Sequence, residues 1–348
     1  MWARAIWVLW LIAWPGWAFP VIPLISTPTV PVYLTTVPGL LGEAGERVWA
    51  ALSDCRLYPE DATDPLLGAL VAAAARGVEV RVLLERRESN PRGEQLAAFL
   101  YLREAGAEVS WDHPQTTMHT KLLLIDDVVV IGSTHWTKSA LLGSVQVDLV
   151  IRSPALAASV GEYLELLYSG ELDARAELAP PPWPEGAVLP LLEFPGAGLH
   201  EAVLPELLAR AGREVDLLLY RFGYYPQYPD SPSNRLVEGL ISALRRGVRV
   251  RILLEGGEGF QDLAEDNRLT ASFLALHGAE VRLDPPWVTT HAKCLIVDGR
   301  DVVVSSANWS YYSLAKNVEA GVAFLDAPAL AARLLVAFEA LWREAAPP

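Results

Sequence analysis

The feature that most constrains the fold of this chain is an internal duplication. Four blocks in its first part recur in the same order in its second part. The matched blocks are ARGVEVRVLLE (75–85) with RRGVRVRILLE (245–255), GAEVSWD (106–112) with GAEVRLD (278–284), TTMHTKLLLID (116–126) with VTTHAKCLIVD (288–298), and DVVVIGSTHW (127–136) with DVVVSSANW (301–309). Chance does not produce such an ordered series, so the chain is predicted to fold as two similar halves.

Each half alternates helical and strand patterns. Residues 66–76 and 236–246 have helical composition and are each followed by a glycine, a common helix stop. The β-branched segments 78–84 and 248–254 come next and predict strands. The expected fold class is therefore α/β, with two similar α/β sandwich domains related by a pseudo-twofold axis. A monomer is expected, because both halves already lie on one chain.

The halves are joined by a proline- and glycine-rich segment. Residues 177–198 read ELAPPPWPEGAVLPLLEFPGAG and predict a linker. The first half is accordingly expected over residues 30–176 and the second over 199–346.

The N-terminus resembles an export signal. Arg4 precedes a ten-residue apolar run, Ala5–Trp14, and small residues at Gly16 and Ala18 fit a signal-peptidase site after Ala18. The run is short for a bilayer span, which needs about 20 residues. We expect residues 1–18 to be a signal peptide and the protein to be exported, either to the periplasm or out of the cell as a secreted protein. An uncleaved membrane anchor and a buried first helix are the alternatives.

The net charge bears on the class of binding partner, and the cysteine count bears on disulfide bonding. The net charge of −14 argues against a protein that lives on nucleic acid, where a basic footprint is usual. The two cysteines, Cys55 and Cys294, cannot form a disulfide framework. Cys294 is expected to be a small buried hydrophobe, and a single bridge between the two is the alternative.

A histidine and a lysine stand one residue apart in both copies of the third block. Residues two apart in a strand share a face, so His119 points the same way as Lys121, and His291 the same way as Lys293. Of the 28 basic residues only four are lysines, and all four lie in or just after a matched block. A compact ammonium at two matched positions predicts a site that holds a phosphoryl group or a similar oxyanion.

Two other interpretations apply to these histidines. In a metal site the neighbouring lysines would repel a divalent ion, and no Glu or Cys completes a first shell. A hydrogen-bonded core histidine is the usual role of one isolated histidine, but it does not account for a matched pair with matched lysines.

An aspartate follows the apolar run of each of these predicted strands. Asp126 and Asp298 lie seven residues after their histidines, on the opposite parity and where a hairpin turns. We expect both to be structural, by turn capping or an ion pair.

With its doubled His-x-Lys-x4-Asp motif, the chain resembles the phospholipase D superfamily, and the resemblance covers essentially all of it after residue 18. The downstream Gly-Ser-x-Asn element of that family corresponds to Gly132, Ser133 and His135 in the first half, and to Ser305, Ser306 and Asn308 in the second. The later acidic position of the family maps to Glu319 and Asp148.

The resemblance implies a mechanism without a metal or cofactor. One histidine attacks phosphorus to give a phosphohistidine, and the other protonates the leaving alcohol. By resemblance, His119 is the nucleophile and His291 the acid. The roles implied for the other positions are a phosphate clamp for Lys121, Lys293 and Asn308, assistance for Ser133 and Ser306, and orientation of the histidines for Glu319 and Asp148.

Three positions depart from the family pattern. His135 replaces the asparagine of the first half, where it is either an extra donor to substrate or a plain substitution. Gln146 stands opposite Asn317, and Ser305 replaces a glycine. The phosphate clamp is therefore expected to be asymmetric.

The leading expectation is an exported phospholipase D-like phosphodiesterase that hydrolyses or transphosphatidylates phospholipid headgroups. Aromatic residues near the motifs suit a phospholipid or membrane-surface substrate, although they could also pack the halves together or stack on bases. These aromatics are Trp111, Trp136, Phe222, Tyr224, Tyr225, Tyr228, Trp287 and Trp309. The alternatives are a nuclease of the same family, a cardiolipin-synthase-like phosphatidyltransferase, and a catalytically silent phosphate- or lipid-binding module.

Overall fold

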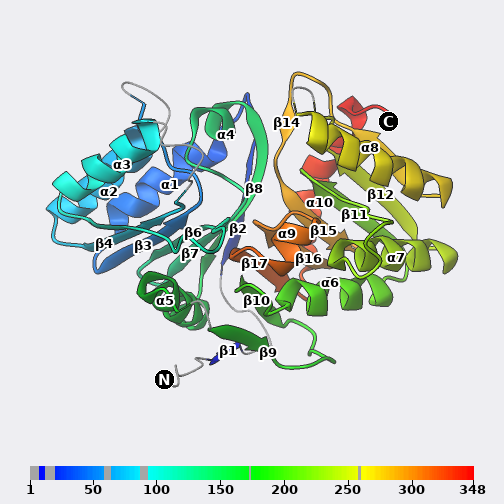
Figure 1. Cartoon of the computed structure of the whole chain (residues 1–348), viewed down its shortest axis with the longest axis horizontal. Helices are drawn as coiled ribbons and strands as arrows, with labels where there is room; N and C mark the ends of the chain where they lie inside the picture. Colours follow the sequence, from blue (N-terminus) through cyan, green and yellow to red (C-terminus); the bar gives the residue numbers. More distant parts are fainter. Residues whose placement is uncertain (1–7, 12–19, 59–63, 87–92, 172–173, 258–259) are drawn as a thin grey trace.

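A computed structural model of the chain describes residues 8–11, 20–58, 64–86, 93–171, 174–257 and 260–348. Figure 1 shows two α/β units side by side, the first drawn from blue to green and the second from green to red. Each unit is built on one mixed sheet with helices on its faces. The predicted α/β fold with two similar domains is confirmed.

The first sheet has the strand order β14-β8-β7-β6-β3-β4-β5, with β2 added on β8. In Figure 1, α1, α2 and α3 cover one face of this sheet and α5 covers the other. The elements of this unit are β2 (Val21–Ser26), α1 (Val32–Glu43), β3 (Arg47–Leu52), α2 (Asp64–Ala75), β4 (Glu79–Leu84), α3 (Gly93–Glu104), β5 (Glu108–Trp111), β6 (Lys121–Ile125), β7 (Val128–Gly132), α4 (Lys138–Leu142), β8 (Ser144–Arg152) and α5 (Pro154–Ser169).

The second sheet repeats this plan in the order β10-β17-β16-β15-β11-β12-β13. The elements of the second half are β10 (Val188–Glu193), α6 (Leu199–Arg210), β11 (Glu214–Leu219), α7 (Pro232–Arg245), β12 (Arg249–Leu254), α8 (Gln261–Leu276), β13 (Glu280–Leu283), β14 (Thr289–Thr290), β15 (Lys293–Val297), β16 (Asp301–Ser305), α9 (Tyr311–Ala315), β17 (Glu319–Phe324) and α10 (Pro328–Glu344).

The predicted helix stops are also found. Gly77 and Gly247 follow α2 and α7 with φ of +87° and +85°, a left-handed conformation that glycine adopts without steric cost.

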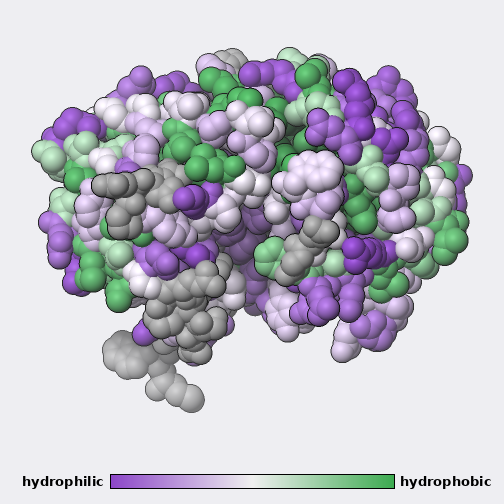
Figure 2. Space-filling view, turned by 90° about the horizontal axis from the view of Figure 1, so that it is seen from above, coloured by the Kyte–Doolittle hydropathy of each residue, from purple (hydrophilic) through white to green (hydrophobic). Residues whose placement is uncertain are grey.

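The two units interlock at their shared boundary. The short strand β14 comes from the second half but pairs with β8 of the first sheet. In the equivalent place of the first half, Met118 forms a bridge to Val318. Tyr163 of α5 donates its hydroxyl to the backbone oxygens of Glu193 and Glu319, both in the second half. Figure 2 shows the surface hollowed between the two halves, with hydrophilic residues in the hollow.

The predicted linker is wrong in part. Residues 188–193 form β10, the edge strand of the second sheet, and residues 175–178 form β9, which pairs with β1 (Val8–Leu11). The second unit therefore begins before residue 199, and the first begins before residue 30, at β2. The boundaries differ because prolines were taken as signs of a loop. Pro190 and Pro23 instead lie in edge strands, where a missing N–H is tolerated.

Most of the predicted signal peptide, residues 1–7 and 12–18, lies outside the described residues, and only the strand β1 within it is described. Among the helices that the structure describes, none combines the length and apolar character required to cross a bilayer. Cys55 and Cys294 are both buried and unbridged. The prediction that Cys294 is a buried hydrophobe is confirmed.

Candidate active site

The two His-x-Lys segments meet where the units interlock. Each histidine is fixed through its backbone to the opposite half: His119 N–H donates to Val318 O at 2.8 Å, and His291 N–H to Val145 O at 2.9 Å. These paired contacts follow the pseudo-twofold relation of the repeat. They bring residues 172 positions apart in the sequence into one site.

The His119 side chain is held by a carboxylate from the second half. Its Nδ1 lies 3.0 Å from both carboxylate oxygens of Glu319, which is completely buried. Since a carboxylate only accepts, Nδ1 carries the hydrogen and Nε2 is left for chemistry. Burial lowers the pKa of His119 to about 4, with the Glu319 charge opposing this and the Lys121 ammonium adding to it. The ring is therefore neutral near pH 7, the form in which a histidine is a nucleophile.

His291 is held by neutral groups from the first half. Its Nδ1 donates to the backbone oxygen of Ser133 at 3.0 Å and lies 3.1 Å from Oε1 of Gln146. Burial, followed by the charge of Lys293, lowers the pKa of His291 well below its usual value. Nδ1 of His119 is thus hydrogen-bonded to a carboxylate, whereas Nδ1 of His291 is hydrogen-bonded to neutral oxygens, one of them from the Gln146 amide.

This geometry corrects the expected role of Asp148. Gln146, not Asp148, occupies the position equivalent to Glu319. Asp148 accepts from the backbone N–H and the hydroxyl of Thr134 instead. The missed signal is spacing, because Gln146 and Glu319 each stand ten residues after the tryptophan of the fourth block. Matching by acidity pairs Asp148 with Glu319 and Gln146 with Asn317, whereas the register of the repeat pairs Gln146 with Glu319.

The substitution of Ser305 for a glycine has a packing cause. In the first half Gly132 lies opposite Asp148, and a Cβ on this glycine would come within 2.5 Å of Asp148. In the second half the order is reversed: Ser305 lies opposite Gly321, where a Cβ would come within 2.7 Å of Ser305. Each half thus places its glycine on a different strand of the pair.

Both motif lysines are buried in the site. The Lys121 ammonium donates to the backbone oxygen of His119. The Lys293 ammonium donates to the backbone oxygen of His291 and lies 3.1 Å from its Nε2. Burial and the charge of Lys121 lower the pKa of Lys293 well below its usual value. Two ammonium groups enclosed together make the site strongly attractive to an anion such as a phosphodiester.

Ser133 and Ser306 hydrogen-bond to Gln146 and Glu319, the side chains that contact the two motif histidines. Ser133 Oγ donates to Gln146 Oε1 at 2.7 Å and Ser306 Oγ donates to Glu319 Oε2. Both hydroxyls are fully buried and also accept a backbone N–H from the neighbouring strand. In addition to the assistance to the phosphate clamp that the resemblance implies, both serines therefore fix Gln146 and Glu319.

A third imidazole, that of His135, packs close to both motif histidines. The ring centroid of His135 is 5.6 Å from that of His119 and 5.0 Å from that of His291. Its Nδ1 is 3.0 Å from Ser53 Oγ, a residue that the sequence did not single out. In the described residues, no group of three or more His, Cys, Asp or Glu side chains is placed to hold a metal ion.

Asn308 occupies the position equivalent to His135 in the second half. Its Oδ1 is buried and has no hydrogen-bond partner within the part of the chain that the structure describes. An orphaned acceptor beside a phosphate site is available to a donor from substrate.

Asp126 and Asp298 are placed as the parity argument predicted. Each lies at the turn of its hairpin in the left-handed region, with φ of +52° for Asp126 and +54° for Asp298. Each carboxylate accepts three consecutive backbone N–H groups, from residues 45–47 and 212–214 respectively. Partial burial acts to raise the pKa of Asp126, but these three donors hold it below its usual value.

A pair of buried carboxyls behind each histidine segment was missed. Glu255 and Asp284 both accept the backbone N–H of Thr290, the residue before His291. Burial, and then the hydrogen bond and charge of Asp284, raise the pKa of Glu255 to about 8. Glu85 likewise accepts the N–H of Met118, before His119. The signal was the glutamate that ends the first block in both copies.

The aromatic residues divide into two groups. Trp136 and Trp309 are buried within their own halves rather than packing the halves together: Trp136 donates to the Tyr33 hydroxyl and Trp309 packs on Phe222. Trp111 stacks on Phe99 at 4.7 Å. Trp287, in contrast, is 77% exposed. An aromatic outside the predicted set, Tyr220, lies in the site, with its ring 4.7 Å from the His291 ring.

Comparison with known proteins agrees with this arrangement. The sequence model described as "Cardiolipin synthase, PLD-like domain" matches residues 39–168 and 204–342, one match in each half. Cardiolipin synthase B of Escherichia coli strain K12 is 26% identical over 326 residues, covering 84% of this chain and 74% of that protein.

Two solved structures share the fold at 15% identity. Phosphatidylserine synthase of Haemophilus influenzae has a TM-score of 0.72 and covers 94% of this chain and 88% of its own. Polyphosphate kinase of Porphyromonas gingivalis has a TM-score of 0.62 and covers 93% of this chain and 47% of its own. With one family match in each half and a doubled histidine–lysine centre, the chain belongs to the phospholipase D superfamily.

Proposed function

We propose that the protein is a phosphatidyltransferase, which moves the phosphatidyl group of a phospholipid to the hydroxyl of an acceptor alcohol. The observation that carries the proposal is the unequal support of the two histidines, by Glu319 for one and by Gln146 for the other. A two-step transfer needs one histidine that becomes a stable covalent carrier and one that exchanges protons.

In the first step His119 Nε2 attacks phosphorus and the bond to the headgroup oxygen breaks. The ring gains positive charge as the N–P bond forms, and the Glu319 carboxylate at Nδ1 stabilises that charge. His291, in its protonated form, gives its proton to the leaving oxygen. The ammonium groups of Lys121 and Lys293 neutralise the phosphoryl oxygens.

In the second step neutral His291 takes a proton from the acceptor alcohol. The alcohol oxygen attacks phosphorus, the N–P bond breaks, and His119 is restored. Gln146 suits this role because an amide holds the ring without fixing a charge on it. The bound phosphodiester anion offsets the lysine charges, which makes protonation of His291 easier than in the empty site.

Transfer is favoured over hydrolysis, the reverse of the order expected from the sequence. Two of the similar proteins are named as synthases, one for cardiolipin and one for phosphatidylserine. The site also limits water, since His291, Lys121 and Lys293 are each more than nine-tenths buried. An acceptor that displaces water from such a site competes well for the phosphohistidine.

The test is incubation of the purified chain with phosphatidylglycerol vesicles and, in parallel, with plasmid DNA. Cardiolipin with released glycerol supports transfer, whereas phosphatidic acid alone supports hydrolysis and nicked DNA supports a nuclease. His119→Asn controls for contaminating activity. A wild-type chain that leaves both substrates intact removes the enzymatic proposal.

We also propose export by the N-terminal segment, and a monomeric protein. N-terminal sequencing of the protein recovered from its native cells tests cleavage after Ala18. Light scattering on the purified chain tests the monomer.

A further inference from the structure

Three buried polar side chains of the second half form a hydrogen-bonded series that the reaction above does not use. His200 Nδ1 lies 2.8 Å from Glu193 Oε2, and His200 Nε2 lies 2.8 Å from Ser305 Oγ. The order carboxylate, imidazole, hydroxyl is that of a hydrolytic triad. However, Ser305, His200 and Glu193 are only 4%, 1% and 1% exposed, so substrate does not reach Ser305 Oγ. We call these three residues the buried triad.

The hydrogen bonds of the buried triad run in one direction. The Glu193 carboxylate accepts three backbone N–H groups at the start of α6, from residues 198–200, and also faces His200 Nδ1. Since a carboxylate only accepts, Nδ1 carries the hydrogen and Nε2 is left to accept from the Ser305 hydroxyl. Ser305 Oγ in turn accepts the backbone N–H of Ala307 at 3.0 Å. The series therefore connects a buried carboxylate to one backbone N–H next to the active site.

Ala307 lies between two residues of the site. Ser306, before it, donates to Glu319, the carboxylate that holds His119. Asn308, after it, has a buried Oδ1 without a hydrogen-bond partner among the residues that the structure describes. The contact at Ala307 thus fixes the backbone from which both of these side chains extend.

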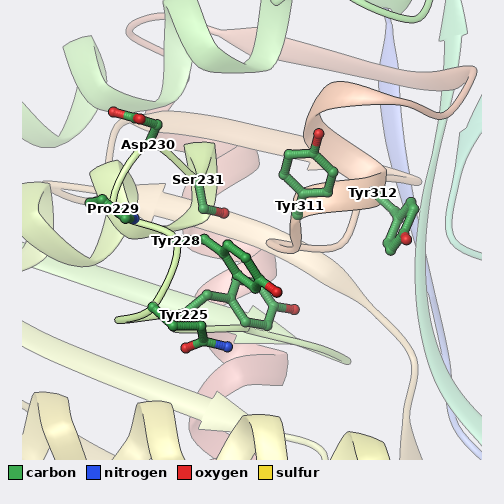
Figure 3. Close-up of a pocket in the computed structure, with 8 residues that line it drawn as sticks. Tyr225, Tyr228, Pro229, Asp230, Ser231, Tyr311 and Tyr312 are labelled. Atoms are coloured by element: carbon green, nitrogen blue, oxygen red, sulfur yellow. The ribbon is translucent and has the colours of Figure 1, made fainter.

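The segment held by the buried triad also borders an open pocket. Figure 3 shows Tyr311 and Tyr312 of α9 on one side of this pocket, and Tyr225 and Tyr228 on the other. Because α9 begins three residues after Asn308, a displacement of the segment would move the wall of the pocket together with the phosphate site.

The first half holds the equivalent backbone N–H in a different way. Thr134 stands at the position of Ala307, and Asp148 accepts its backbone N–H directly at 3.1 Å. Gly321 stands at the position of Asp148 in the second half and has no carboxylate to offer. The buried triad supplies a carboxylate from β10 instead, through two intervening side chains.

The buried triad belongs to the second half alone. Ser26, Tyr33 and Gly132 stand at its three positions in the first half, and the Tyr33 hydroxyl accepts from Trp136 Nε1 at 2.9 Å. The repeat therefore does not account for the triad, which accompanies the half that carries Asn308 and not the half that carries His135.

We propose that Glu193, His200 and Ser305 are positioning residues of the transfer reaction, which hold Asn308 in the orientation that contacts the phosphodiester. Without the Ser305 hydroxyl the N–H of Ala307, a residue only 1% exposed, would be buried unpaired, and the segment would shift towards another acceptor. A shift of about 1 Å in a group at the reacting phosphate lowers a rate by up to about 100-fold. This inference rests on the proposed function, because it names further residues on which that reaction depends.

The test is a double-mutant cycle with Ser305→Ala and Asn308→Ala, measured as kcat/KM on phosphatidylglycerol vesicles. We expect Ser305→Ala to lower kcat/KM about tenfold. The double variant should lose no more than Asn308→Ala alone, because the group to be positioned is already gone. Wild-type kcat/KM in Ser305→Ala, or losses that add in the double variant, overturn the inference.

Two further variants complete this design. Ser153→Ala is the matched control, since Ser153 is 2% exposed and its hydroxyl accepts the N–H of Leu156 in α5, away from the site. It should lose thermal stability but keep the wild-type kcat/KM. His200→Phe removes the hydrogen bonds of the imidazole with a ring of similar size. It should show the same non-additivity with Asn308→Ala, so the cycle does not depend on the folding of one variant.

Titration with inorganic phosphate separates this inference from the proposed function. Phosphate probes the site without turnover, and we expect its affinity to fall about tenfold in Ser305→Ala and to stay unchanged in Ser153→Ala. Weaker phosphate binding in Ser305→Ala, together with a wild type that transfers no phosphatidyl group, would overturn the proposed function alone. Transfer by the wild type, with the same kcat/KM and phosphate affinity in Ser305→Ala, would overturn the role of the buried triad alone.

Discussion

Both carboxylate oxygens of Glu319 lie 3.0 Å from Nδ1 of His119, although 200 residues separate the two in the sequence. The carboxylate comes from β17 of the second sheet, and the histidine precedes β6 of the first. Gln146 of β8 reaches His291 in the equivalent way. Each half therefore supplies the support for the other half's histidine.

Replacing Glu319 should damage the reaction more than changing Gln146. Glu319→Gln keeps a hydrogen bond to His119 but removes the negative charge, and we expect the transfer rate to fall roughly 100-fold or more. Gln146→Glu keeps a hydrogen-bond acceptor for His291 Nδ1, and we expect the transfer rate to fall less than about tenfold. Initial rates on phosphatidylglycerol vesicles measure both. Equal losses in the two variants would contradict the unequal roles of the histidines.

The activity should have an acid limb set by His119. Attack requires the neutral ring, so kcat/KM should fall as the pH drops towards its pKa of about 4. The Glu319 charge favours the protonated ring, so Glu319→Gln should move this limb to lower pH. Exposed Glu344→Gln is the control and should leave the profile unchanged. A limb that does not move in Glu319→Gln would assign the titration to another group.

His135 should be replaceable by asparagine but not by alanine. Asparagine stands at the equivalent position 308, and its amide can hydrogen-bond a phosphoryl oxygen as a neutral imidazole can. We expect His135→Asn to stay within about fivefold of the wild-type kcat/KM, and His135→Ala to lose about ten- to 100-fold, as for one lost hydrogen bond to a charged group. Steady-state kinetics test this. If alanine were harmless, His135 would be a plain substitution.

Stability should decline as the pH rises from 4.5 to about 8 because of Glu255. Its pKa is raised from 4.5 to about 8 in the folded chain, so the folded state retains a proton that the unfolded state releases. The resulting stabilisation is complete below pH 4.5 and is lost as the pH rises through about 8. Glu255→Gln cannot titrate, so its Tm should vary less between these limits. If the Tm of Glu255→Gln changed with pH as steeply as the Tm of the wild type, Glu255 would not be the group responsible.

Much of the site was predictable from the sequence, because repeated spacing encodes repeated structure. The parity of His119, Lys121 and Asp126 correctly separated the two side chains that lie in the site from the aspartate that caps the hairpin turn. The exchange of Glu319 and Gln146 between halves was not predictable, because strand parity describes one sheet and says nothing of a second sheet facing it. The strand β10 was missed because proline at a sheet edge has the same local signature as proline in a loop.

The backbone contacts of His119 to Val318 and of His291 to Val145 have a consequence for how such a centre can specialise. If two identical subunits built it, every substitution would change both histidine supports together. Because one continuous chain builds it here, the support on each side varies alone, and this protein carries an acid at one and an amide at the other. The covalent link between the halves is what allows symmetry to be broken at the point where the reaction needs two different histidines.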